Sequence, residues 1–242
     1  VTGVQTCALP ISSHGGPNRR PHAGGQRRGG NDASRRGSSD KSLGGEQLEG
    51  RQAVRELLLA HRRKAREIWI ANDIDDADVI DDIRELAADS RVQVLDVPRK
   101  KIELTARSEA PQGVIAFASP LPEADFDEML VAKNGVNPFL VALDGVTDPG
   151  NLGALLRCCD GAGVTGVVLP RHRSVHVTPT VAKAAAGAIE HIDIAVVPGL
   201  PNAMEKMKKA RVWTIGLDDA ADRSLFEIGD LARDPVCIIL GA

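Results

Sequence analysis

Apolar residues in the second half of the chain form short runs that are separated by amphipathic segments. Phe139–Leu143 and Val236–Leu240 are apolar throughout, which is typical of strands buried on both faces of a sheet. The expected order is strand 139–143, helix 152–162, strand 164–169, helix 179–189, strand 192–197, helix 202–209, strand 212–217 and strand 236–240. Strands that alternate with helices predict a mostly parallel α/β sheet covered on both faces.

A smaller α/β unit precedes this one. The elements that hydrophobic periodicity predicts there are a helix from Leu48 to about His61, a strand at 68–71, a helix at 75–88 and strands at 92–97 and 114–118. We therefore expect a small domain over residues 46–120. Residues 121–137, with Pro122 near their start and mixed charge, read as a linker to the second domain at 138–242.

The first 45 residues have a different composition. Residues 1–50 hold 11 of the 24 glycines and carry seven Lys/Arg against four Asp/Glu, although the whole chain has a net charge of −3. Such a segment cannot bury enough apolar surface to fold, so we expect a disordered basic arm over 1–45. Its paired arginines suit RNA phosphates, and a solvated tail without a partner remains the alternative. Residues 1–12 do not match the rest of the arm and are left out of the fold prediction as a candidate artefact.

Composition excludes several classes of protein. No run approaches 18 consecutive apolar residues, so no membrane span is expected. The four cysteines, at positions 7, 158, 159 and 237, form neither a disulfide framework nor a CxxC zinc pattern, which favours a reducing cytoplasm. Aromatic residues make up only 2% of the chain, which argues against platforms that stack on single-stranded bases.

Basic residues of the small domain occur at two places that are distant along the chain. They are Arg51, His61, Arg62, Arg63, Lys64 and Arg66, and then Arg99, Lys100 and Lys101. These residues could converge into one phosphate-binding face, or they could simply be solvated.

The loop from Asp144 to Asn151 is the most informative segment. It follows the carboxyl end of a buried strand, and ligands bind at such ends in parallel sheets. The segment 218–222 and whatever follows Leu240 also lie at the carboxyl ends of predicted strands. Gly153 and Arg157 lie four residues apart on one helix face, so the absent side chain at 153 would leave room for the guanidinium. By spacing alone, Asn151 could be only an N-cap and Arg157 only a surface residue.

Two other patterns carry less weight. The glycines of Gly161–Gly166 spell GxGxxG, but they end a helix and precede a strand, so we interpret them as a helix cap and turn. His172 and His176 have no nearby carboxylate or thiol, so no metal site is expected. Arg171, Arg173 and Lys183 are either phosphate contacts or solvated charges.

The segment Leu143-Asp-Gly-Val-Thr-Asp-Pro-Gly-Asn-Leu-Gly-Ala-Leu-Leu-Arg157 closely resembles the first signature of the SpoU/TrmH class (SPOUT superfamily) of RNA ribose 2′-O-methyltransferases. The segments Lys183–Glu190, Trp213–Leu217 and Ile238–Ala242 agree with it. Gly50–Val54 and Gln112–Val114 resemble the ribosomal-protein-L30e-like substrate-binding domain of the branch that methylates a guanosine of 23S ribosomal RNA. The resemblance covers roughly residues 48–242.

The resemblance implies transfer of a methyl group from S-adenosylmethionine to a ribose 2′-hydroxyl of ribosomal RNA. It implies Asn151 and Arg157 as catalytic residues, Leu217, Leu240 and Gly241 as cofactor contacts, and, for the full-length protein, a homodimer formed through the methyltransferase domain. Because a guanidinium group is an awkward base, we expect Arg157 to bind the target phosphate and stabilise charge on the 2′-oxygen, with Asn151 orienting it.

Family members continue past the position of Ala242 into a segment that closes a trefoil knot around the cofactor. We therefore expect this chain to lack the knot-forming end and much of its cofactor pocket, and to be an inactive fragment if the natural protein is longer. Two alternatives remain: a non-catalytic RNA-binding protein, and a methyltransferase that acts on transfer RNA or confers antibiotic resistance.

Overall fold

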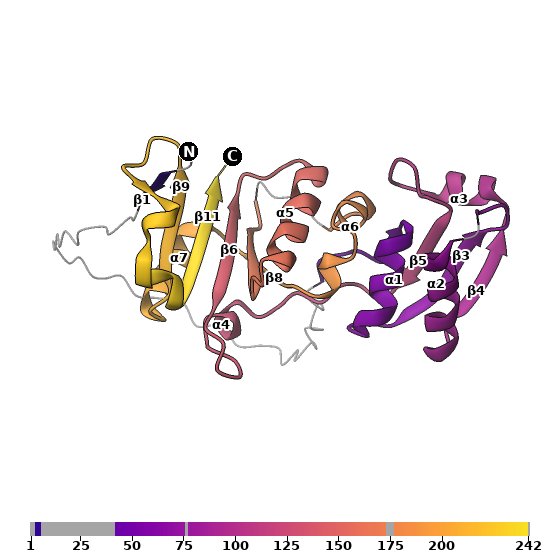
Figure 1. Cartoon of the computed structure of the whole chain (residues 1–242), viewed down its shortest axis with the longest axis horizontal. Coiled ribbons are helices and arrows are strands. Elements are labelled where there is room, and N and C mark those ends of the chain that lie inside the picture. The colour runs from indigo at the N-terminus through magenta and orange to yellow at the C-terminus, as the bar shows by residue number, and fades with distance from the viewer. Residues whose placement is uncertain (1–2, 6–41, 76, 173–176, 242) are drawn as a thin grey trace, which may run out of the picture.

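The computed structural model describes residues 3–5, 42–75, 77–172 and 177–241. Two α/β units lie side by side along the long axis of the molecule (Figure 1). The ordered contacts of the small domain begin before residue 46, its expected start, since Ser42 bridges Pro122 and Leu43 is buried. Most of the predicted disordered arm lies outside the described residues.

The small domain contains a four-stranded sheet in the order β2-β5-β3-β4. Its elements are β2 (Gln47–Glu49), α1 (Arg51–Ala60), β3 (Ala65–Ala71), α2 (Asp78–Asp89), β4 (Gln93–Val97), α3 (Arg99–Thr105) and β5 (Val114–Ala118). Leu48 was expected in a helix but lies in β2, because Gly50, at φ 100°, separates this strand from α1. Helix α3 was not predicted, since it is short and buries only Ile102.

The large domain contains a seven-stranded sheet in the order β10-β1-β9-β11-β6-β7-β8, in which β1 is Gly3–Gln5 and β10 is Arg223–Ser224. Its main elements are β6 (Phe139–Asp144), α5 (Pro149–Gly161), β7 (Gly166–Pro170), α6 (Pro179–Ala184), β8 (Asp193–Val197), α7 (Leu200–Lys209), β9 (Trp213–Asp218) and β11 (Val236–Gly241). Strands β9, β11, β6, β7 and β8 are parallel, which confirms the predicted mostly parallel α/β sheet. The predicted helix 179–189 ends early, at Ala184, and a 3-10 turn, η1 (Ala188–Glu190), follows it.

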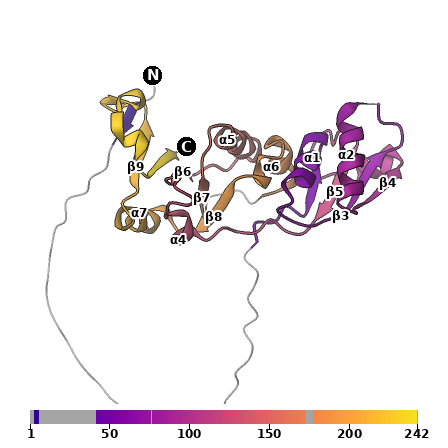
Figure 2. The same cartoon turned by 60° about the horizontal axis from the view of Figure 1, so that its bottom comes forward.

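Helices cover both faces of the large sheet, as the continuous apolar strands predict (Figure 2). In β6, Val141 and Leu143 pack with residues of α5 and α6, whereas Leu140 and Ala142 pack with residues of α7. No helix in the described part of the chain is long and apolar enough to cross a membrane.

Two segments contribute more to the fold than their composition suggested. The expected linker 121–137 contains α4 (Phe126–Met129) and buries Leu121, Met129 and Leu130. Within residues 1–12, which the fold prediction left out, Gly3–Gln5 form β1, an antiparallel neighbour of both β9 and β10 (Arg223–Ser224).

Gly153 allows α5 and α6 to approach closely. A Cβ atom at position 153 would lie 2.5 Å from the Cβ atom of Ala184 and 2.8 Å from both the amide nitrogen of Ala185 and the carbonyl oxygen of Val181. The expectation that Gly153 leaves room for Arg157 is therefore wrong, because a neighbouring helix fills that space.

Replacing Gly153 with alanine should destabilise the protein by about 1–3 kcal/mol, because the added methyl group overpacks the contact between α5 and α6. Gly161→Ala, at the end of the same helix, is the matched control, since nothing lies within 4 Å of a Cβ atom there. The two free energies of unfolding can be compared by urea denaturation. Equal stabilities would show that α6 shifts freely to accept the methyl group.

Candidate active site

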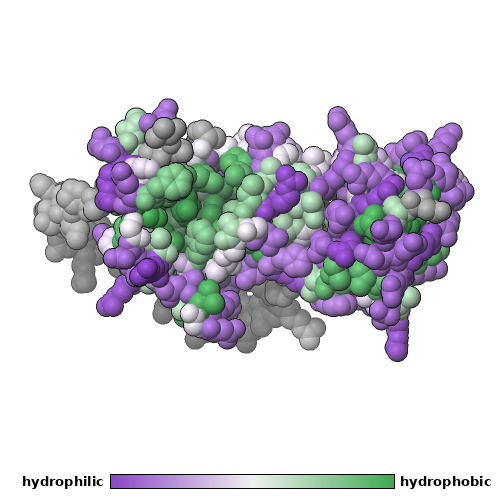
Figure 3. Space-filling model, viewed as in Figure 1, coloured by the Kyte–Doolittle hydropathy of each residue, from purple (hydrophilic) through white to green (hydrophobic). Residues whose placement is uncertain are grey.

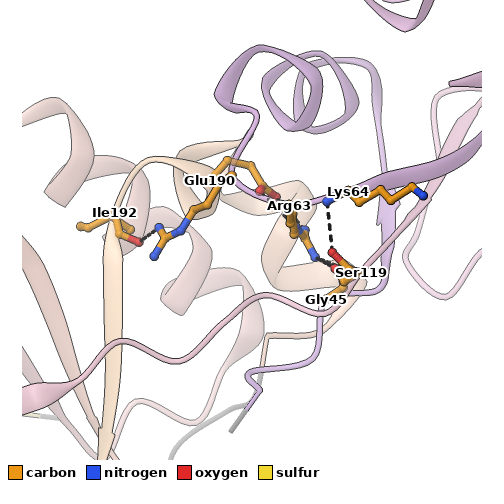
Figure 4. Close-up of polar contacts among 7 residues, drawn as sticks. Gly45, Arg63, Lys64, Ser119, Glu190 and Ile192 are labelled. Carbon is orange, nitrogen blue, oxygen red and sulfur yellow. Dashed lines mark hydrogen bonds and ion pairs between the residues drawn. The ribbon is translucent and has the colours of Figure 1, made fainter. Parts of the chain in front are cut away.

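A buried ion pair joins the two domains. The guanidinium of Arg63 donates from Nε and Nη2 to the carboxylate of Glu190, at 3.0 and 2.6 Å, and its Nη1 donates to the carbonyl oxygens of Gly45 and Ser119 (Figure 4). The two charged side chains are 2% and 0% exposed. Because the charge of Arg63 is shielded from solvent and neutralised, Arg63 cannot belong to the phosphate-binding face that the sequence left open.

Neighbouring contacts strengthen this junction. Arg62 donates to the carbonyl oxygen of Ile192 at 2.7 Å and to the carboxylate of Asp193 at 2.6 Å. On the other side, His191 lies 2.9 Å from the carboxylate of Glu56. These contacts set the orientation of the small domain against the large one.

Arg99, at the start of α3, is also occupied, by a salt bridge to Asp73 with an Nε–Oδ2 distance of 2.9 Å. The hydrogen bond from Arg99 holds the pKa of the Asp73 carboxyl below its usual value, and the same pair raises the pKa of Arg99. Arg51 donates from Nε to the carbonyl oxygen of Gln112, and Lys101 lies over the ring of Trp69. Together with Arg62, Arg63 and Arg99, five of the nine basic residues considered for a phosphate-binding face therefore have partners within the protein.

A cleft of about 620 Å³ opens between the domains, a size typical of ligand sites. We call it the interdomain cleft. It is lined by Glu49, Gly50, Gln52, Ala53, Arg107, Ser108, Glu109 and Gln112 of the small domain and by Arg157, Thr180, Lys183, Ala184 and Ala186 of the large domain. The cleft brings together the side chains of Arg107, Arg157 and Lys183. Of these, sequence reasoning singled out Arg157 and Lys183 and missed Arg107.

Lys183 was expected to be either a phosphate contact or a solvated charge, and the structure shows neither. Its ammonium group donates to the carbonyl oxygen of Glu109 and, at 2.7 Å, to that of Ala110. Lys183 therefore ties the large domain to a loop of the small domain. Arg173 and His176 lie outside the described residues, and His172 and Arg171 are exposed.

Asn151 is not the N-cap of α5, although its spacing alone allowed that role. Asp148 is the N-cap, and its carboxylate accepts from the backbone amide of Asn151 at 2.7 Å. Asn151 is therefore three residues inside the helix, and its exposed side chain makes no hydrogen bond with any other described residue. Arg157 lies six residues further on, about 9 Å along the helix axis, so the two side chains are not adjacent.

Gly161–Gly166 behaves as expected of a helix cap. Helix α5 ends at Gly161, Gly163 adopts the left-handed conformation at φ 72°, and β7 begins at Gly166. This order of helix, turn and strand is opposite to that of a dinucleotide-binding loop.

The predicted cofactor residues lie at the carboxyl ends of adjacent strands. Leu240 pairs with Leu143 and Gly241 with Asp144 across β11 and β6, while Leu217 is near the end of β9, the other neighbour of β11. Leu217 and Leu240 are half-buried, and a Cβ atom at Gly241 would meet nothing within 4 Å. Apolar side chains gather over this part of the sheet in Figure 3. A half-buried apolar edge with an open glycine suits an adenosine ring.

The buried thiols are poor candidates for nucleophiles. Burial raises the pKa of Cys159 to about 11 and that of Cys237 to about 12. Because the thiolate is the reactive form, both side chains are inert near neutral pH.

Comparisons with known proteins identify the family of both domains. A model of the SpoU rRNA Methylase family matches residues 138–242, and a model of the RNA 2′-O ribose methyltransferase substrate-binding domain matches residues 47–124. The chain is 38% identical over 200 residues to the 23S rRNA (guanosine-2′-O-)-methyltransferase RlmB of Pseudomonas aeruginosa, covering 81% of this chain and 79% of that protein. It is 37% identical to RlmB of Pseudomonas syringae pv. tomato, covering 81% and 78%.

Solved structures show the same fold. The SpoU methyltransferase AviRb from Streptomyces viridochromogenes, in complex with the cofactor AdoMet, superposes with a TM-score of 0.62 at 20% identity, covering 81% of this chain and 72% of AviRb. An AdoMet-bound rRNA methyltransferase from Sinorhizobium meliloti gives a TM-score of 0.60 at 21% identity, covering 80% and 69%. With its two matched domains and its similarity to RlmB, the chain belongs to the SpoU family of RNA 2′-O-ribose methyltransferases.

Proposed function

We propose that this protein transfers a methyl group from S-adenosylmethionine to the ribose 2′-hydroxyl of a guanosine in 23S ribosomal RNA. The observation that carries the proposal is the 38% identity to RlmB across both domains, which includes the substrate-binding domain. We further propose that it acts in the cytoplasm as a homodimer formed through the large domain.

Arg157 is the residue that we propose to act on the ribose. Its side chain is exposed to the interdomain cleft, and it makes no hydrogen bond or ion pair with any other described residue. A free guanidinium in a cleft can bind a phosphate and stabilise negative charge that develops on the 2′-oxygen. Asn151, exposed near the start of the same helix, is proposed to orient the substrate rather than Arg157, because the two side chains are not adjacent.

Leu217, Leu240 and Gly241 are the residues that we propose to hold the cofactor. When bound, S-adenosylmethionine supplies a methyl group that its positively charged sulfur already activates. The remaining tasks of the protein are therefore to position the ribose and to help remove the proton of the 2′-hydroxyl.

The test is methyl transfer from radiolabelled S-adenosylmethionine to 23S ribosomal RNA by the protein as its gene encodes it. Transfer RNA and 16S ribosomal RNA are the matched substrates, and nuclease mapping identifies the modified nucleoside. We expect one 2′-O-methylguanosine in 23S RNA and much less label in the other two. Label mainly in transfer RNA would contradict the proposed substrate. RNA binding without any transfer would favour the non-catalytic alternative.

A further inference from the structure

The loop from Arg107 to Gly113, which we call the cleft loop, has an unusual backbone. Ala110 and Gln112 have φ angles of 49° and 57°, and Gly113 follows at 75°. Residues with a side chain rarely adopt positive φ, and such strain persists only where the surroundings hold it. The shape of the cleft loop is therefore imposed by its contacts.

One of these contacts comes from within the small domain. Glu49, on β2, is fully buried and accepts hydrogen bonds from the amides of Arg107 and Ser108, at 2.7 and 3.0 Å, and from the hydroxyl of Ser108. A buried carboxylate requires such partners, so Glu49 fixes the first residues of the loop.

The second contact comes from the large domain. Lys183 donates to the carbonyl oxygens of Glu109 and Ala110, the middle of the cleft loop. The loop is thus a wall of the interdomain cleft that both domains hold in place.

Arg107 projects from this wall into the same cleft as Arg157, and its side chain has no hydrogen bond or ion pair within the described part of the chain. Glu109 also lines the cleft, whereas Lys183 and Glu49 are occupied by the loop. Neutral partners leave the charges of Lys183 and Glu49 in place, so the three cations and two carboxylates that line the cleft leave a single positive charge. A phosphodiester group carries one negative charge and matches the planar donors of arginine.

We propose that Arg107 binds the phosphate next to the target ribose, across the cleft from Arg157, and that Lys183 is a positioning residue that holds the cleft loop. The RNA strand would then pass between the two domains. This inference rests on the proposed function, because it places the target ribose beside Arg157.

The first arm of the test measures the affinity for 23S ribosomal RNA at several salt concentrations, together with kcat and KM for methyl transfer. Arg107→Ala should weaken binding about tenfold, raise KM for RNA and reduce the slope of log K against log salt by about 0.7–0.9, the value for one phosphate. Arg107→Lys should keep the slope. Arg233→Ala removes an exposed arginine outside the cleft and should leave the affinity, KM for RNA and the salt slope unchanged.

The second arm tests Lys183. Lys183→Met should weaken RNA binding and raise KM while leaving the salt slope unchanged, because its ammonium group binds carbonyl oxygens rather than a phosphate. Lys183→Arg should recover part of the affinity, since arginine can also donate to these carbonyls. A loss of slope in Lys183→Met equal to that in Arg107→Ala would overturn the positioning role.

The outcomes separate this inference from the proposed function. If the unaltered protein transfers methyl groups and Arg107→Ala matches it in KM and salt slope, Arg107 does not bind the phosphate and the proposed function stands. If the unaltered protein transfers none, the proposed function fails, and an unchanged salt slope in Arg107→Ala would then also overturn the phosphate site.

Discussion

Arg157→Ala should reduce methyl transfer more than tenfold and leave the melting temperature nearly unchanged. The side chain faces the interdomain cleft and has no partner among the described residues, so its removal costs little packing. If its guanidinium stabilises charge on the 2′-oxygen or binds the neighbouring phosphate, Arg157→Lys should not restore the rate, because lysine lacks the planar donor pair. Single-turnover methylation at saturating cofactor measures the effect on the chemical step.

Two neighbouring variants serve as controls. Asp148→Ala removes the observed N-cap of α5 and should lower stability by about 1 kcal/mol. Asn151→Ala leaves that cap in place, so a loss of rate without a loss of stability would report its contact with the substrate. Near-normal rates in both Arg157 variants would place Arg157 among ordinary surface residues.

Glu190→Gln should destabilise the protein by about 3–5 kcal/mol, because it leaves the guanidinium of Arg63 buried without a counter-charge. The expected fall in the free energy of unfolding can be measured in urea at neutral pH. Arg84→Ala breaks an exposed pair with Asp96 and is the control, with an expected cost below about 1 kcal/mol.

A double-mutant cycle with Arg63→Met sharpens this test. Removing both charges should cost less than the two single changes added together, since neither charge is then left unpaired. Additive costs would mean that the ion pair contributes nothing to the junction between the domains.

The sequence by itself determined the helices and strands that are specified by the pattern of neighbouring residues. Continuous apolar runs such as Phe139–Leu143 are typical of strands buried on both faces, and the structure places β6 there with helices on both sides. The long first signature, from Leu143 to Arg157, gave the family, which the comparisons confirm. The order of glycines after α5 was enough to reject a dinucleotide site.

Short elements escaped prediction because their stability comes from distant parts of the chain. Strand β2 exists because it pairs with β5, some 70 residues away, and a three-residue strand has no periodicity of its own. The early end of α6 also depends on a distant part of the chain. Gly187, at φ 97°, follows it where a Cβ atom would lie 2.3 Å from Glu56 of the other domain.

Only the tertiary structure decided which charges serve the fold and which remain free for a substrate. Arg63 stands in a basic run, Lys183 among alanines and Arg107 between Ala106 and Ser108, and none of these surroundings shows whether the charge has a partner. Arg63 meets its carboxylate 127 residues away, and Lys183 meets two carbonyl groups across the domain boundary. The side chain of Arg107 has no such partner among the described residues. The free energy of a charged side chain depends on the solvent and partners around it, and chain folding alone brings those partners together.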